Sequence, residues 1–150
     1  GGTSTPLVPG DVMMSSVMSY DGMSKIGSML GAGSVIVMDD TTCMVKTLER
    51  IAEFYYEESC GQCTPCREGT GWLYRVVKRI VHGEGTQEDL DRLLAVANNI
   101  SGNTICALGE AAATPVLSFI KHFEEEFQYH IDHKCSMVSS SNTSEGQVAL

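Results

Sequence analysis

The sequence has 150 residues, enough for one compact domain with a sizeable core, and its 43% hydrophobic and 19% charged content is typical of a globular protein. Its formal net charge of −9 argues against nucleic-acid binding, because acidic surfaces repel phosphate backbones. The sequence contains no apolar run long enough to cross a membrane, and its start lacks the features of a secretory signal peptide.

The first 40 residues predict one strand and little other regular structure. Residues 1–12 are rich in Gly, Thr, Ser and Pro, which indicates a loop, and residues 20–30 predict a short helix. The β-branched apolar run SVIVMDD over 34–40 predicts a short strand. Because the chain offers this strand no partners and begins without Met, we expect the segment to close the edge of a sheet that belongs to a longer protein.

Amphipathic helices are predicted from residue 42 onward. The first covers about 42–58, and the second follows a cysteine-rich stretch and continues to Val81. Thr86, with Asp89 three residues later, resembles a capping box and predicts the start of a third helix that ends at Ile100.

A fourth amphipathic helix is predicted to begin at Thr114 as the N-cap, with Pro115 at its first position. Four such helices with short connections predict a mainly α fold, a four-helix bundle over residues 42–135. The small and polar residues 136–150 predict a disordered tail.

The stretch ESCGQCTPCREG places Cys60, Cys63 and Cys66 at C-x2-C-x2-C spacing. Thiolates at this spacing can wrap one face of a compact iron–sulfur cluster, because Gly61 and Pro65 turn the loop inward. Three thiolates leave one iron of a [4Fe–4S] cube without a protein ligand. We therefore expect a fourth thiolate from a distant part of the chain.

Two cysteines downstream are candidates for the fourth ligand. Cys106 lies in the apolar stretch NTICALGE between the third and fourth helices. In an antiparallel bundle this connection returns to the end that carries the first three cysteines, whereas Cys135 lies in the polar C-terminal stretch and Cys43 precedes the first helix. The expected ligands are therefore Cys60, Cys63, Cys66 and Cys106.

The expected site also has favourable electrostatics. Pro65 and Cys66 lie where the second helix begins, so free N–H groups and the positive end of the helix dipole would stabilise thiolates and bridging sulfides. With every iron bound by the protein, the site is expected to carry single electrons and no catalytic residue. His130 and His133, close to Cys135, are interpreted as a solvated helix end and not as a metal site.

Two other uses of the cysteines fit the sequence less well. Structural zinc sites usually combine two separated C-x2-C pairs, unlike this triplet with a distant single cysteine. Disulfides fit poorly because the triplet is too crowded for its members to pair with one another. A reducing compartment with a metal site fits the six cysteines better.

ESCGQCTPCREG followed by TICALG resembles the iron–sulfur region of the flavin- and NADH-binding subunit of respiratory complex I, NADH:quinone oxidoreductase. GGTSTPLVP and SVIVMD resemble the end of the β-grasp (SLBB-like) domain of that subunit, which would assign residues 1–41 to this domain. The resemblance implies that NADH reduces FMN in an N-terminal part that this sequence lacks. Single electrons would then pass to a [4Fe–4S] cluster and onward to quinone, with the same four cysteines as ligands.

The resemblance also implies partners and a location. The partners would be the remainder of the flavoprotein subunit and neighbouring iron–sulfur subunits, at the cytoplasmic face of a bacterial inner membrane or on the matrix side in a mitochondrion. The alternatives are the equivalent subunit of a soluble NAD-linked hydrogenase or formate dehydrogenase, and a zinc-stabilised helical interaction module. By itself the segment would lack the NADH and FMN sites.

Overall fold

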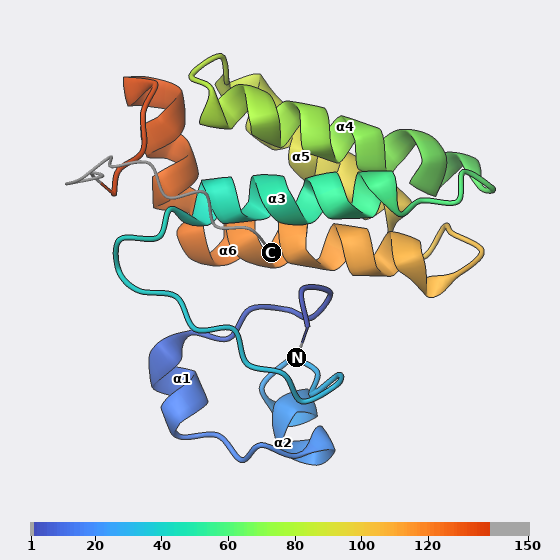
Figure 1. Cartoon of the computed structure of the whole chain (residues 1–150), viewed down its shortest axis with the longest axis vertical. Helices are drawn as coiled ribbons and strands as arrows, with labels where there is room; N and C mark the ends of the chain where they lie inside the picture. Colours follow the sequence, from blue (N-terminus) through green and yellow to red (C-terminus); the bar gives the residue numbers. More distant parts are fainter. Residues whose placement is uncertain (1, 139–150) are drawn as a thin grey trace.

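The computed structural model describes residues 2–138 and consists of a four-helix bundle with a mostly irregular N-terminal segment beside it (Figure 1). The long helices are α3 (Met44–Glu57), α4 (Thr64–Val81), α5 (Gln87–Ile100) and α6 (Ala107–His133). The N-terminal segment contains the short helices α1 (Gly10–Met14) and α2 (Tyr20–Lys25). The predicted mainly helical fold is confirmed.

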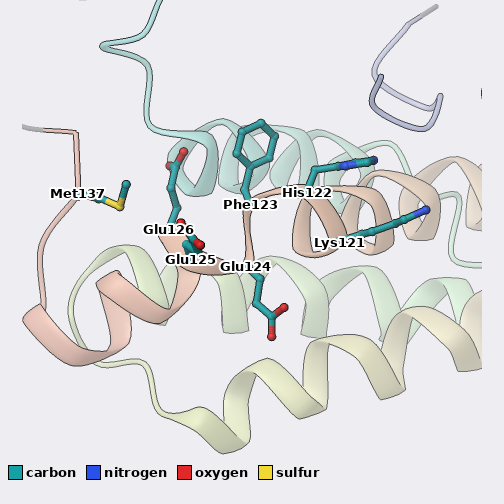
Figure 2. A pocket seen from close by; sticks show the side chains of 7 residues that line it. All are labelled: Lys121, His122, Phe123, Glu124, Glu125, Glu126 and Met137. Carbon is teal, nitrogen blue, oxygen red and sulfur yellow. The ribbon is translucent and has the colours of Figure 1, made fainter. Parts of the chain in front are cut away.

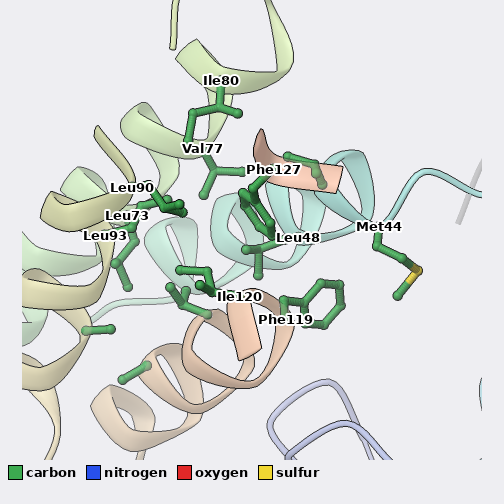
Figure 3. Packing of buried hydrophobic residues seen from close by; sticks show 14 of the residues in the cluster. Met44, Leu48, Leu73, Val77, Ile80, Leu90, Leu93, Phe119, Ile120 and Phe127 are labelled. Atoms are coloured by element: carbon green, nitrogen blue, oxygen red, sulfur yellow. The ribbon is translucent and has the colours of Figure 1, made fainter. Parts of the chain in front are cut away.

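The four long helices form because each carries an apolar stripe at helical spacing. Leu48, Leu73 and Leu93, from three of the helices, are 0–1% exposed, and Phe127 from α6 is fully buried among them. Figure 3 shows side chains from all four helices meeting in this one core. Burial of these stripes stabilises the bundle and thereby fixes the loops that join its helices.

Two local features of the bundle follow directly from the sequence. The capping box predicted at Thr86 is confirmed: its hydroxyl accepts from the Asp89 amide, and the Asp89 carboxylate accepts from the Thr86 amide. Gly69 lets α4 approach α5 closely, because a Cβ added there would lie 2.7 Å from two side-chain carbons of Ile100. This close approach is near the end of the bundle that carries the cysteine-rich loop.

The strand predicted over 34–40 is not formed in this structure, since no strand occurs among residues 2–138. The segment carries exposed apolar side chains, with Val37 88% exposed. A strand requires a second strand to pair with, and residues 2–138 contain none.

The predicted start of the fourth helix is also wrong. α6 begins earlier, at Ala107, and passes through Pro115, which is buried inside it. Proline removes one backbone hydrogen bond from a helix interior. Here the buried side chains around it, including Ala113 and Val116, belong to the core shared with the other helices and offset that cost.

Helix α6 bends at Phe123, which has the non-helical angles φ −131° and ψ 30° (Figure 1). The part of α6 after the bend returns Phe127 and Ile131 to the core. Lys134 follows the helix with a left-handed φ of 60°, and its ammonium donates to the carbonyl of Gly85 at 2.9 Å. The end of α6 is thus held against the connection between α4 and α5.

The N-terminal segment is joined to the bundle by hydrogen bonds. The hydroxyls of Thr3 and Tyr55 lie 3.0 Å apart, and the amide of Leu7 donates to the hydroxyl of Ser118 at 3.2 Å. The predicted tail over 136–150 lies outside the described residues from 139 onward. None of the helices within 2–138 combines the length and apolar character needed to cross a bilayer.

Truncating the core should destabilise the bundle. We expect Leu48→Ala to lower the free energy of unfolding by about 2–5 kcal/mol, because it removes a fully buried side chain and leaves a cavity. Met14→Ala, at a position 89% exposed, should change that free energy by less than about 0.5 kcal/mol. Chemical denaturation of both variants checks this, and equal effects would contradict the core described above.

Candidate metal centre

The four cysteines predicted as ligands line one cavity of about 270 Å³. Three come from the loop between α3 and the start of α4, and one comes from the loop between α5 and α6. Both loops lie at the same end of the bundle (Figure 1). The lining residues are Glu58, Cys60, Gln62, Cys63, Cys66, Ile105, Cys106 and Leu108.

Two helices begin at this cavity with a cysteine as N-cap. Cys63 precedes the first residue of α4, and Cys106 precedes the first residue of α6. Pro65 lies in the first turn of α4, where its missing N–H costs nothing. The free N–H groups and dipoles of both helices therefore make this end of the bundle favourable for negative charge.

Polar groups around the sulfur atoms also favour negative charge at this cavity. The backbone amide of Ile105 holds the pKa of the Cys63 thiol below its usual value, against desolvation, and the Cys66 amide and Arg67 guanidinium also lower that pKa. The hydroxyl of Ser59 lies 3.3 Å from the sulfur of Cys66. The influence of Ile105 on Cys63 connects the two loops, because the amide comes from one loop and the thiol from the other.

The cysteine-rich loop turns sharply at Gly61, whose φ of 74° lies in the left-handed region that glycine adopts without strain. The guanidinium of Arg67 donates to the carbonyl of Gly61 at 3.2 Å and so holds this turn against the first turn of α4. Cys60 is exposed and Cys66 is buried. The site therefore has one side toward solvent and one side toward the core.

The donor set fits an iron–sulfur cluster. Four thiols surround a cavity whose surface is almost entirely apolar, and Ile105 and Leu108 contribute apolar side chains to it. Soft thiolate ligands select iron–sulfur clusters and zinc over harder metal ions. Within residues 2–138, no three His, Cys, Asp or Glu side chains are grouped so as to hold a single metal ion.

The remaining cysteines lie elsewhere. Cys135 is exposed and Cys43 is buried, and neither lines this cavity. The sulfur of Cys43 lies 3.2 Å from Nε2 of His130. His130 is fully buried and its Nδ1 has no hydrogen-bond partner among residues 2–138, so the interpretation of His130 as part of a solvated helix end is wrong. His133 is exposed, as expected.

The burial of His130 follows from the bend of α6, which turns the last part of this helix across the start of α3. A second, more polar hollow lies at the bend (Figure 2). Glu126, one of its lining residues, accepts a hydrogen bond from the amide of Met44 at 3.0 Å. This hollow contains no cysteine, and the Glu126 contact caps the start of α3.

Residues 46–130 match the family described as the NADH-ubiquinone oxidoreductase-F iron-sulfur binding region. The chain belongs to this family. The resemblance inferred from the cysteine motifs is therefore confirmed, and the family match covers both loops that line the cavity.

Relatives that share this region are long proteins, each named as a subunit of NADH-quinone oxidoreductase. The relative from Rhizobium meliloti is 51% identical over 132 residues, which are 88% of this chain and 30% of that protein. The relative from Rickettsia bellii is 48% identical over 131 residues, 87% of this chain and 31% of that protein. The relative from Mycobacterium tuberculosis is 47% identical over 132 residues, 88% and 29% respectively. The chain thus spans about a third of the length of these relatives.

A solved structure of an NAD⁺-reducing [NiFe]-hydrogenase in the air-oxidized state has the same fold. Its TM-score is 0.78 at 28% identity, over 87% of this chain and 22% of that chain. The helical architecture of the family is therefore shared between two kinds of NAD-linked oxidoreductase.

The sequence predicted the four cysteines as ligands but not the groups that support them. Ile105 and Leu108 line the cavity, and the Ile105 amide acts on Cys63. The apolar run around Cys106 in NTICALGE, which includes Ile105 and Leu108, was the signal for this lining. The amide contact depends on how the two loops meet, which no local pattern specifies.

The buried imidazole should make stability depend on pH. Burial lowers the pKa of His130, Lys46 lowers it further, and Glu126 opposes this. Since the unfolded chain takes up this proton near pH 6.5 and the folded chain only at lower pH, the free energy of unfolding should fall as pH drops below about 6.5. The part of this decrease that is due to His130 should end once the pH lies below the pKa of His130 in the folded chain.

Denaturation of His130→Gln across this pH range checks the assignment, and this variant should show a flatter pH dependence than the unchanged chain. His122→Gln, at an exposed position, is the matched control and should keep the original dependence. Equal flattening in both variants would contradict it.

Proposed function

We propose that this chain binds one [4Fe–4S] cluster through Cys60, Cys63, Cys66 and Cys106. We further propose that it carries electrons within the NADH-oxidising flavoprotein subunit of a respiratory NADH:quinone oxidoreductase. One observation carries this proposal: four thiols from two loops, distant in sequence, share one apolar cavity where two helices begin. Membership of an iron-sulfur binding family supports it.

Each group around the cavity has a role in this function. The four thiolates bind the irons, and a cluster bound in this way accepts and releases one electron at a time. The N-termini of α4 and α6 stabilise the negative charge of the thiolates. Ile105 and Leu108 give the cavity its apolar lining on the side of the second loop.

The NADH and FMN sites belong, in this proposal, to the part of the subunit that precedes the chain. The chain spans about 30% of its relatives' length, so most of such a subunit lies outside it. Residues 1–41 would end a β-grasp domain, and the run over 34–38 would pair with strands of that preceding part. The exposed apolar side chains of Val35, Ile36 and Val37 support this pairing, because the bundle does not cover them.

The electron partners would be the flavin of the same protein and a neighbouring iron–sulfur subunit. The assembly would place the chain peripherally at the cytoplasmic face of a bacterial inner membrane. A hydrogenase-type role is the second candidate, favoured by the similarity to the hydrogenase structure. The higher identity to quinone oxidoreductase subunits, 51% against 28%, favours the first role.

Exchange of single cysteines tests the ligand set. Cys106→Ser should lose or degrade the cluster, because a hydroxyl is a poor replacement for the fourth thiolate at a cavity built from two loops. Cys135→Ser should retain it, because Cys135 does not line the cavity. Iron content and electron paramagnetic resonance of the reduced protein measure the result.

The opposite pattern, with iron lost in Cys135→Ser and kept in Cys106→Ser, would overturn the assignment. A colourless protein that contains zinc and no iron would instead support the zinc-stabilised interaction module.

A further inference from the structure

We infer that Glu110 is a positioning residue for the metal centre: its carboxylate anchors the loop over 101–106 and thereby holds Ile105 and Cys106 at the cavity. This inference rests on the proposed function, since it concerns how that site is kept in shape. Glu110 lies in the first turn of α6 and does not line the cavity itself.

The carboxylate of Glu110 accepts two hydrogen bonds from the start of the loop. The hydroxyl of Ser101 donates to Oε2 at 2.8 Å, and the amide of Gly102 donates to Oε1. Gly102 has a φ of 74°, so the chain reverses direction at this point. The turn that leaves α5 is therefore fastened to the first turn of α6 by a single side chain.

A second contact seats the middle of the same loop. Gly109 lies so close to Thr104 that an added Cβ would collide with the Cγ2 atom of that threonine. The hydroxyl of Thr104 donates to the carbonyl of Cys106 at 2.9 Å. The start and the middle of the loop are therefore both fixed against α6. This fixes where residues 105 and 106 lie at the cavity.

The consequence reaches the metal centre through the last two residues of the loop, because Ile105 and Cys106 both line the cavity. Ile105, Cys106 and Cys63 line the same cavity, and the Ile105 amide lowers the pKa of the Cys63 thiol. Hydrogen bonds to ligand sulfur tune the reduction potential of iron–sulfur clusters. Glu110 thus acts on the cluster through Ile105, and its own negative charge is kept because the Gly102 amide and the Ser101 hydroxyl lower its pKa.

Glu110→Ala and Glu110→Gln separate anchoring from charge. Both variants remove the negative charge, but only Gln keeps an oxygen that can accept from the loop. If Glu110 anchors the loop, Glu110→Ala should speed hydrogen–deuterium exchange of the Ile105 amide by about tenfold or more, because hydrogen bonds to a charged group are among the strongest in proteins. Glu110→Gln should restore part of the protection.

The measurement uses the complete, cluster-loaded protein, with the midpoint potential and the electron paramagnetic resonance line shape recorded alongside exchange. Glu110→Ala should change the line shape and shift the potential differently from Glu110→Gln, at unchanged iron content. Glu125→Ala, an exposed acidic position beyond the bend of α6, is the matched control and should change neither.

Equal potentials, line shapes and Ile105 exchange in Glu110→Ala and Glu110→Gln would overturn the anchoring role and leave only a charge effect. Failure of the unchanged protein to bind iron would overturn the proposed function. These two failures are distinguishable, because exchange at Ile105 reports on the loop whether or not iron is present.

Discussion

Sulfur atoms from two loops, separated by the whole of α4 and α5, have to lie around one cavity, and the architecture of the chain follows from this requirement. The cysteine-rich loop follows α3, and the second loop precedes α6. The two loops can meet only because the four helices alternate in direction and pack on a single core. Neither loop could form the cavity alone, because each supplies only part of its lining. The apolar stripes of the helices therefore serve the site by fixing the end of the bundle where it lies.

The electrostatics of the cavity follow from the same arrangement. Cys63 and Cys106 are N-caps, so the two loops bring not only thiols but also two helix N-termini to one place. The Ile105 amide, from one loop, lowers the pKa of the Cys63 thiol in the other. Negative charge on four thiolates would thus be compensated by backbone dipoles and N–H groups, with Arg67 contributing at the edge of the site.

The parts of the fold that local physics determines could be predicted from sequence. The capping box at Thr86, the apolar stripes and the cysteine spacing each depend on residues close in the chain. The strand over 34–40 is not formed among residues 2–138, because a strand is stable only beside another strand and these residues contain none. The start of α6 was predicted wrongly because proline is common at the first position of helices. Here Pro115 lies inside the helix, and burial outweighs its cost. His130 was misplaced because the bend at Phe123 has no sequence signature of the usual kind.

We expect the cavity at the end of the bundle to hold one iron–sulfur cube. The iron and acid-labile sulfide content of the purified protein, with electron paramagnetic resonance after reduction, measures this most directly. We predict about four irons and four sulfides per chain and a paramagnetic signal in the reduced state. A single zinc ion per chain without sulfide, and no such signal, would contradict the proposed cluster.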